Sequence, residues 1–443
     1  MKLFRPGRGW QGAISLGGDK SISHRLVLFA LQHRGRFIIE NLSQCDDVKT
    51  SLKIFEQAGG RIETLPDKRL CLESPAEISD LRHSEIFCGN SGTTARLLCG
   101  ILAGLPFSFR LTGDESLSRR PMRRVIEPLE KMGASFSCNN GRLPLTITGS
   151  AKLDPICHNL QVASAQVKTA ILLAATRAEG LTTIEEPLQS RNHSEIMLMK
   201  LGAEITADAG RITLRGPFNS AGDFSFKVPG DTSSAAFIVA AATLLPGSEI
   251  EINNVLLNPQ RIAFLHKLKQ MGARLSWKVE SSEFEESGTI YAGFSPDLKA
   301  VSIEGHEVPG LIDELPVLAA VMALANGTSS VRGAAELRIK ESDRISSICR
   351  LLKQIGVEVE ELEDGYCITG PAKITKRHTV EPAGDHRIAA TMAVMALASE
   401  QGMLIANHQC IKISFPEFSD FFQTFSPETF FEAKNDFSWL SLN

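Results

Sequence analysis

The sequence predicts an α/β protein of two similar domains, each made of three repeated units. Three observations support this fold class. A short polar cluster opens an apolar helix six times along the chain, and an amphipathic helix that ends in a glycine follows five of these helices. The chain of 443 residues is also longer than a single hydrophobic core normally accommodates. Six units divide naturally into two groups of three.

The polar clusters begin about 65 to 85 residues apart, and each precedes a run of apolar residues. They occupy residues 18–21, 89–94, 164–168, 230–234, 313–316 and 384–387. The apolar runs, such as residues 235–245 and 317–325, are hydrophobic around nearly the whole helical circumference. Helices of this kind are buried on all sides. We therefore expect them inside each domain, with their N-terminal ends exposed at one edge.

Several of these clusters contain a cation where a helix prefers an anion. Lys20, Arg25, Lys168 and Arg387 lie in or near first turns, although unpaired N–H groups and the helix dipole make that end positive. A bound phosphate or carboxylate would satisfy both the backbone and the side chains. The alternative is that each cluster is only a helix cap. Capping explains the Ser, Thr and Asp residues but not the cations, and it is the preferred interpretation for residues 230–234, which contain no cation.

The second helix of each unit has its own end signal. Glycine is the expected residue just past the last turn of a helix, and a short alternating run that predicts a strand comes after each one. The glycines are Gly59, Gly133, Gly202, Gly272 and Gly356. Basic residues recur where the second helices begin, at Arg119, Arg120, Arg123, Arg124, Arg191, Arg261, Lys340 and Arg344. Of these, Arg119, Arg123 and Arg124 are expected to be solvated.

The composition excludes several classes of function. A net charge of −4 argues against a nucleic-acid-binding surface. Nine cysteines without a Cys-x-x-Cys motif indicate reduced thiols and a cytoplasmic location. The histidines lack the spacing of zinc ligands, so no metal or other cofactor is expected. The longest apolar run is too short to span a bilayer, and residues 1–17 do not form a signal peptide.

Seven stretches, in order along the chain, resemble the signatures of the 5-enolpyruvylshikimate-3-phosphate synthase family. They are GDKSISHR at residues 18–25, GNSGTTAR at 89–96, RPM at 120–122, SAQVK at 164–168, DELP at 313–316, LRIKESDR at 337–344 and DHRI at 385–388. The resemblance implies two domains of three βαβαββ units each, an inverse α/β barrel, with inner helices aimed at a cleft between the domains. It places residues 1–18 plus 229–443 in one domain and residues 19–228 in the other, with crossings near Gly18 and Val228.

The same resemblance implies a reaction of the shikimate pathway, which leads to chorismate and the aromatic amino acids. The enolpyruvyl group of phosphoenolpyruvate is transferred to the 5-hydroxyl of shikimate 3-phosphate, and phosphate leaves from a tetrahedral intermediate. Both substrates carry a phosphate and a carboxylate, which suits helix N-termini and guanidinium groups. Family members act without a cofactor and are usually monomeric.

Site residues follow from the resemblance, position by position. Those implied for shikimate 3-phosphate are Lys20, Ser21, Arg25, Ser164, Gln166, Arg191, Asp313 and Lys340. Those implied for phosphoenolpyruvate are Lys20, Asn90, Gly92, Thr93, Arg120, Gln166, Arg344 and Arg387. We expect Asp313 to accept the hydroxyl proton, and Glu341 with Lys20 to serve the methylene carbon.

Each assignment has a plainer alternative. Asp313, Ser164 and Thr93 could act as helix caps. The arginines Arg120, Arg344 and Arg387 could form surface ion pairs with Glu115, Asp343 and Asp385 respectively. Gly92 could be a turn residue or could leave space for a ligand.

Two rival functions remain open at this stage. The enolpyruvyl transferase that acts on UDP-N-acetylglucosamine is similar in fold, but it typically carries a cysteine in a flexible loop, and residues 111–122 contain none. A non-catalytic phosphometabolite-binding protein on the same scaffold would not need Asp313 or Glu341. In either enzyme, cations on two facing domains should repel one another, so an open empty cleft is expected. Lys412 and the aromatic tail from residue 425 to 443 receive no assigned role.

Overall fold

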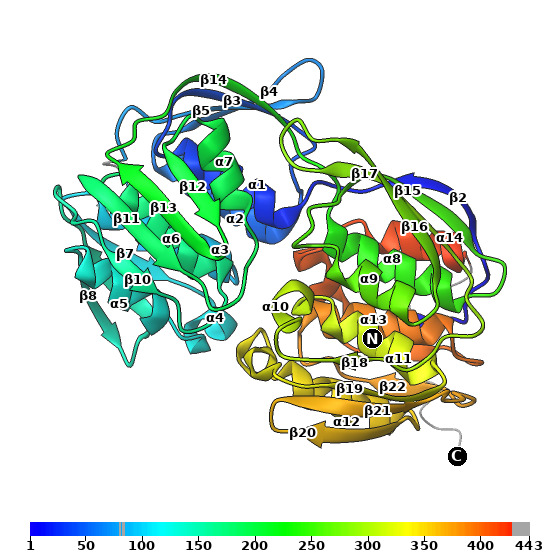
Figure 1. Cartoon of the computed structure of the whole chain (residues 1–443). Helices are drawn as coiled ribbons and strands as arrows, with labels where there is room; N and C mark the ends of the chain where they lie inside the picture. The colour runs from blue at the N-terminus through cyan, green and yellow to red at the C-terminus, as the bar shows by residue number, and fades with distance from the viewer. Residues whose placement is uncertain (79–80, 82–84, 428–443) are drawn as a thin grey trace.

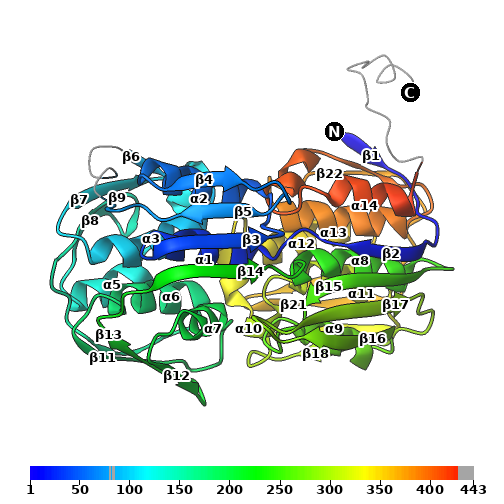
Figure 2. The ribbon, with the colours of Figure 1, turned by 90° about the horizontal axis from the view of Figure 1, so that it is seen from above.

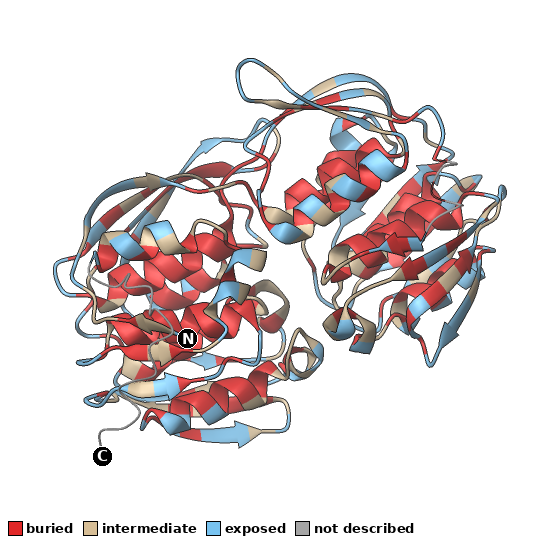
Figure 3. Ribbon diagram, turned by 180° about the vertical axis from the view of Figure 1, so that it is seen from behind, coloured by how far each residue is buried: buried red, intermediate tan, exposed pale blue. Residues whose placement is uncertain are grey.

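The computed structural model describes residues 1–78, 81 and 85–427, and these gather around two hydrophobic cores (Figures 1 and 3). Core 1 consists of buried side chains from Ile22 to Val228 together with Leu256. Core 2 consists of Phe4, Leu16 and buried side chains from Ala235 to Phe425. The two bodies lie side by side when seen from above (Figure 2). The domain boundaries predicted from the sequence, near Gly18 and Val228, remain a prediction.

In the described part of the chain, three units surround core 1, each with two main helices and a four-stranded sheet, and the second unit has a short extra helix. The first contains β14 (Ala221–Lys227), α1 (Lys20–Ala30), β3 (Arg34–Glu40), α2 (Asp46–Gln57), β4 (Arg61–Thr64) and β5 (Leu70–Glu73). The second contains β6 (Glu85–Phe87), α3 (Gly92–Ala103), β7 (Ser108–Thr112), the short α4 (Glu115–Arg119), α5 (Arg123–Lys131), β8 (Ser135–Asn139) and β9 (Arg142–Thr148). The third contains β10 (Cys157–Asn159), α6 (Ala165–Ala175), β11 (Gly180–Glu185), α7 (His193–Lys200), β12 (Ile205–Asp208) and β13 (Arg211–Gly216).

Three further units surround core 2. The first contains β2 (Gln11–Ser15), α8 (Thr232–Leu244), β15 (Glu249–Leu256), α9 (Ala263–Gln270), β16 (Arg274–Ser281) and β17 (Ser287–Gly293). The second contains β18 (Ser302–Ile303), the short α10 (Val308–Leu311), α11 (Leu315–Leu324), β19 (Gly327–Val331), the 3-10 turn η2 (Ala335–Ile339), α12 (Arg344–Gln354), β20 (Glu358–Leu362) and β21 (Gly365–Gly370). The last contains β22 (His378–Val380), α13 (His386–Leu397), β23 (Met403–Ile405), η3 (His408–Ile413), α14 (Phe418–Phe425) and β1 (Lys2–Phe4).

Strand pairing repeats from unit to unit. In each four-stranded sheet two strands are parallel and the remaining pairs are antiparallel, as where β6 pairs parallel with β7 and β9 pairs antiparallel with β7 and β8. The last unit departs from this pattern, because its sheet has three strands and the N-terminal β1 pairs antiparallel with β23. Phe4, at the end of β1, also contacts the ring of Phe422 in α14, with centroids 5.0 Å apart. The predicted tail therefore begins inside core 2, while residues 428–443 lie outside the described part of the chain.

The six predicted apolar helices all form, as α1, α3, α6, α8, α11 and α13. Five begin with a side chain that accepts a hydrogen bond from the backbone of the first turn, namely Asp19, Ser91, Ser164, Asp231 and Asp385. These helices lie inside, and the sheets lie outside them (Figure 3). Small residues permit close packing, since a Cβ at Gly100 of α3 would lie 2.1 Å from the Ala170 carbonyl oxygen of α6.

The glycines predicted to end the second helices do so. All five have a positive φ, between 88° and 107°, in the left-handed region that glycine adopts without strain. Each is therefore a helix C-terminus that the local sequence dictates.

The two crossings between the bodies lie next to each other. Gly18 and Gly230 form an antiparallel bridge, and the Asp19 amide donates to the Pro229 carbonyl at 2.8 Å. A Cβ at Gly18 would lie 1.8 Å from the Asn41 carbonyl oxygen, so this close approach requires glycine. Within residues 1–78, 81 and 85–427, every helix is too short or too polar to cross a lipid bilayer.

Lys168 corrects one of the sequence interpretations. Its Nζ lies 2.8 Å from Glu186 Oε2 and 2.6 Å from Glu195 Oε1, and the three side chains are at most 4% exposed. Two carboxylates, not a ligand, neutralise this cation in α6. The interpretation of Lys168 as evidence for a bound phosphate or carboxylate was therefore wrong.

Replacing Lys168 with alanine would leave Glu186 and Glu195 as neighbouring buried carboxylates without a counter-charge. We expect Lys168→Ala to lower the free energy of unfolding by about 3 to 5 kcal/mol, measured by guanidinium chloride unfolding followed by circular dichroism. Lys53→Ala, on the exposed face of α2, is the control and should change it by less than about 0.5 kcal/mol. Equal effects of the two substitutions would contradict the structural role of Lys168.

Candidate active site

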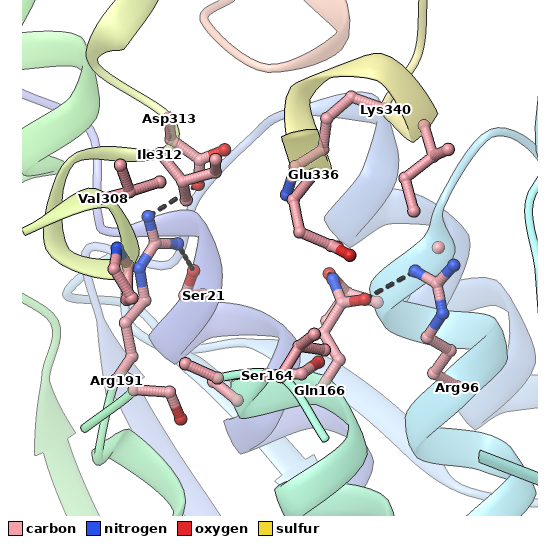
Figure 4. A pocket seen from close by; sticks show the side chains of 18 of the residues that line it. Ser21, Arg96, Ser164, Gln166, Arg191, Val308, Ile312, Asp313, Glu336 and Lys340 are labelled. Carbon is pink, nitrogen blue, oxygen red and sulfur yellow. Dashed lines mark hydrogen bonds and ion pairs between the residues drawn. The ribbon is translucent and has the colours of Figure 1, made fainter. Parts of the chain in front are cut away.

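A cleft of about 430 Å³ lies between the elements of core 1 and those of core 2. All six inner helices present residues at or next to their first turns to it, and this is why the polar clusters recur in phase along the chain. Their contributions are Lys20 and Ser21, Gly92 and Thr93, Ser164 to Gln166, Asp231 and Ser233, Asp313, and His386 with Arg387. Figure 4 shows Ser21, Ser164 and Gln166 on one side of this cleft and Asp313, Glu336 and Lys340 on the other.

Cations outnumber carboxylates in the lining. The cationic side chains are Lys20, Arg25, Arg96, Arg120, Arg124, Arg191, Arg261, Lys340, Arg344 and Arg387, and the carboxylates are Asp47, Asp231, Asp313, Glu336 and Glu341. The ammonium group of Lys340 makes no hydrogen bond or ion pair within the described part of the chain. Such a surplus of positive charge between helix N-termini favours a ligand with more than one anionic group.

Asp313 is the carboxylate around which the arginines gather. Its Oδ2 accepts from Arg191 at 2.6 Å, and Arg344 and Arg387 lie 3.6 and 3.7 Å from its carboxylate. Burial alone would raise the pKa of Asp313, but these arginines and Lys340 lower that pKa well below its usual range. Since α11 begins at Leu315 and its N-cap residue is Glu314, the alternative that Asp313 is a helix cap is wrong.

Glu341, close to the start of α12, is likewise a carboxylate surrounded by arginines. It lies 2.5 Å from Arg344 Nη2 and 3.2 Å from Arg120 Nη1. Burial would raise the pKa of Glu341, while Arg344, Arg120 and His386 lower it well below the usual value. Both carboxyl groups are therefore ionised and serve as counter-charges to arginine.

Lys20 lies where α1 meets the segment that follows η3. Its Nζ is 2.9 Å from Asp47 Oδ2 and 2.9 Å from Ser414 Oγ. Burial lowers the pKa of Lys20, but Asp47 and other neighbouring groups together outweigh burial, and the pKa is raised. Lys412, which the sequence left without a role, is exposed on η3.

The surface-ion-pair alternative for three arginines is wrong. Arg120, Arg344 and Arg387 are only 7%, 1% and 9% exposed. Arg120 pairs with Glu341 and not with Glu115, and the carboxylates beside Arg387 belong to Asp313 and Glu314. Arg344 bonds to the Asp385 side chain, but this contact is buried.

Every predicted substrate residue except Asn90 lines the cleft. Asn90 lies behind Arg120: its Oδ1 accepts from Arg120 Nη2 at 2.7 Å, and its Nδ2 donates to Asp114 at 2.6 Å. It orients a cation of the cleft from outside the lining. Ser164 both caps α6 and lines the cleft, so its two roles coincide. Thr93 lines the cleft but does not cap α3, whose N-cap is Ser91.

Gly92 keeps space for guanidinium groups. It is the first residue of α3 and lacks a positive φ, so it is not needed for a turn. A Cβ there would lie 2.9 Å from Arg96 Nη1 and 3.3 Å from Arg120 Nη1. The space that glycine leaves is therefore occupied by the arginines of the cleft.

Sequence reasoning missed several residues of the lining. Arg96 belongs to a recognised motif and donates to Gln166 Oε1 at 2.6 Å, but it received no role. Arg124 was expected to be solvated, yet it lines the cleft and lies 3.0 Å from Glu336. The run of arginines at residues 119–124 does not show that Arg124 lines the cleft. The motif at residues 89–96, which ends in Arg96, could have predicted a role for that residue.

Among the described residues, three ion pairs cross the cleft, and each joins an arginine on the core 1 side to a carboxylate on the core 2 side. They are Arg191 with Asp313, Arg120 with Glu341, and Arg124 with Glu336. Facing charges are therefore opposite and attract. The expected repulsion between facing cations is not the dominant interaction across this cleft.

The fold of the chain resembles that of solved enolpyruvyl transferases. An enolpyruvyl transferase from Streptomyces tendae matches 96% of this chain and 98% of its own with a TM-score of 0.72 at 17% identity, which shows a shared fold. An EPSP synthase from Acinetobacter baumannii matches 95% of this chain and 96% of its own with a TM-score of 0.81 at 34% identity. The chain thus has the enolpyruvyl transferase fold, as the predicted fold class required.

Sequence relatives narrow this class to one family. A model of the EPSP synthase (3-phosphoshikimate 1-carboxyvinyltransferase) family matches residues 4–422. Relatives named 3-phosphoshikimate 1-carboxyvinyltransferase include one from Thermotoga neapolitana, 43% identical over 94% of this chain and 98% of its own. Another, from Syntrophomonas wolfei, is 41% identical over 94% of this chain and 97% of its own. The chain belongs to the EPSP synthase family, as its seven motifs predicted.

Among the described residues, no three His, Cys, Asp or Glu side chains are grouped as metal ligands would be.

An anion that binds only the folded chain stabilises it by mass action. We expect inorganic phosphate, at matched ionic strength, to raise the melting temperature measured by scanning fluorimetry. Lys340→Met removes an unpaired ammonium from the cleft and should weaken phosphate binding about tenfold. Lys373→Met, at an exposed position near core 2, should leave binding unchanged. An equal rise in all three proteins would show that phosphate acts elsewhere.

Proposed function

We propose that the chain transfers the enolpyruvyl group of phosphoenolpyruvate to the 5-hydroxyl of shikimate 3-phosphate and releases phosphate. One observation carries this proposal: Lys20, Arg120, Lys340 and Arg387 come from both bodies and converge on one cleft. Two substrates that each carry a phosphate and a carboxylate match that charge. Family membership over residues 4–422 supports the same reaction.

The proposed binding residues divide between the substrates as the motifs imply. Those proposed for shikimate 3-phosphate are Lys20, Ser21, Arg25, Ser164, Gln166, Arg191, Asp313 and Lys340. Those proposed for phosphoenolpyruvate are Lys20, Gly92, Thr93, Arg120, Gln166, Arg344 and Arg387, with Asn90 acting through Arg120. Holding both reactants in one cleft removes much of the entropic barrier to a bimolecular step.

Asp313 is proposed as the base for the 5-hydroxyl. Its low pKa makes it a weak base while Arg387, Arg191 and their neighbours stabilise the carboxylate. If Arg191 turns toward the anionic substrate, it stabilises the Asp313 carboxylate less, and the pKa of Asp313 rises. Binding of the substrate then activates the base that its hydroxyl needs.

Glu341 is proposed to deliver the proton to the methylene carbon, with Lys20. The cations that keep the Glu341 carboxylate ionised, Arg344 and Arg120, are also proposed ligands of phosphoenolpyruvate. A bound phosphate and carboxylate would compete for these guanidinium groups and raise the pKa of Glu341. The 5-hydroxyl oxygen bonds to C2 of phosphoenolpyruvate while Asp313 takes the hydroxyl proton and protonated Glu341 gives its proton to the methylene carbon, which forms the tetrahedral intermediate. The C–O bond to phosphate then breaks, a methyl proton returns to Glu341, and the proton held by Asp313 leaves with the phosphate.

We also propose that residues 1–18 plus 229–443 and residues 19–228 form the two domains, supported by the separate cores and the paired crossing at Gly18 and Gly230. A cytoplasmic location is supported by the nine free cysteines. We propose a monomeric state because members of the family are usually monomeric, and light scattering would test this proposal.

Phosphate release distinguishes this function from its rivals. With phosphoenolpyruvate present, we expect release with shikimate 3-phosphate to be at least about 10²-fold faster than with UDP-N-acetylglucosamine, because polar groups built for one acceptor stay unpaired with the other. The two rates are measured with a coupled phosphate assay. The opposite preference would assign the chain to the UDP-sugar reaction, and no release with either acceptor would favour a binding protein.

Asp313→Asn tests the proposed base. The substitution keeps the shape of the side chain but removes the proton acceptor, so we expect kcat to fall about 10² to 10⁴-fold. Steady-state kinetics and substrate titration separate this loss from weaker binding. Asp297→Asn, at an exposed position, should behave as the unsubstituted chain. A loss of only a few-fold in kcat with normal binding of both substrates would rule out this role.

A further inference from the structure

A hairpin tip reaches from one body of the molecule to the other, away from the cleft lining. Strands β16 and β17 belong to the sheet over core 2, but Phe284, in the turn between them, packs against core 1. Its ring lies 5.1 Å from that of Phe226, and Lys200 at the end of α7 donates to the Glu283 carbonyl. The tip is therefore fixed to the elements of core 1.

Glu285, the next residue in this tip, is a buried carboxylate that the proposed chemistry does not use. It is 4% exposed, and each of its oxygens has one partner. Oε1 lies 2.6 Å from His193 Nδ1, and Oε2 accepts from Asn258 Nδ2 at 2.7 Å. His193 is the first residue of α7 and has no exposed surface. A buried carboxylate held by two donors fixes both donors in place.

The partners of His193 determine which ring nitrogen carries the hydrogen. Arg261 Nη1 lies 3.3 Å from His193 Nε2. A guanidinium only donates hydrogen bonds, so Nε2 is the acceptor and Nδ1 carries the hydrogen that is donated to Glu285. Arg261 is itself held by Asp19, the N-cap of α1, at 2.7 Å. The imidazole ring is thus held on both edges.

The same network fixes the residue before His193. Asn258 Nδ2 also donates to Asn192 Oδ1 at 2.8 Å. Asn192 is the N-cap residue of α7 but makes no side-chain capping bond, so contacts from core 2 elements hold this helix start instead. Arg191 comes directly before it and reaches Asp313 and Ser21 with its guanidinium (Figure 4).

We propose that Glu285 is a positioning residue for Arg191: through His193, Asn258 and Asn192 it fixes the start of α7 and with it the guanidinium that binds shikimate 3-phosphate. The assignment of that substrate rests on the proposed function. Glu285 touches neither substrate. Its effect is on the orientation of one cation, so it acts on the binding of one substrate and not on the chemical step.

Steady-state kinetics with each substrate varied in turn test this proposal. Glu285→Ala removes both hydrogen bonds, and we expect the KM for shikimate 3-phosphate to rise about tenfold while kcat and the KM for phosphoenolpyruvate change less than about threefold. Glu285→Gln keeps an acceptor for His193 but directs an NH₂ group at Asn258, so a smaller rise is expected. Glu286→Gln, an exposed neighbour in the same tip, is the matched control and should show no change.

A double-mutant cycle separates positioning from a general loss of structure. If Glu285 acts through Arg191, adding Glu285→Gln to Arg191→Ala should produce no further rise in the KM for shikimate 3-phosphate. Additive effects, or equal losses for both substrates, would overturn the proposal, as would an unchanged KM in both Glu285 variants. Absence of turnover by the unsubstituted chain would instead overturn the proposed function and this inference together.

Discussion

The ion pairs around Asp313 join the two bodies of the molecule at the centre of the cleft. Arg191 reaches this carboxylate from the core 1 side, while Arg344 and Arg387 reach it from the core 2 side. Partly buried cations are costly unless paired, and here carboxylate side chains of the cleft are the paired anions. A substrate with a phosphate and a carboxylate can replace those anions without leaving the arginines unpaired.

The six-fold repeat explains how so many charges meet in one place. Each unit turns the start of its inner helix toward the cleft, and aspartates that cap some of these helices also bind arginines. Asp19 caps α1 and binds Arg261, and Asp385 caps α13 and binds Arg344. A carboxylate in these positions stabilises the helix dipole and a guanidinium at once. Folding of the helix ends and construction of the site are therefore the same process.

Features that depend on neighbouring residues could be predicted from the sequence, and features that depend on distant ones could not. The helix ends at Gly59 or Gly356 are decided within a few residues. The pairs Arg191 with Asp313 and Arg124 with Glu336 join residues 122 and 212 positions apart. No local pattern shows that Arg124 turns inward, or that Lys168 already has carboxylate partners. Family motifs located most of the cleft lining because they carry information about such distant contacts.

The contacts between the two bodies differ in strength along the interface. At the crossing, the Asp19–Arg261 pair is 0% and 2% exposed, and in the cleft the Arg124–Glu336 pair is 27% and 38% exposed. Breaking a buried pair costs about 3 to 5 kcal/mol, whereas an exposed pair contributes at most about 1 kcal/mol. Any opening of the cleft therefore separates the exposed pairs first and leaves the crossing intact. Glu285 is linked through His193 and Arg261 to Asp19 at the crossing. The start of α7 therefore keeps its position when substrate anions replace the carboxylates that pair with the arginines of the cleft.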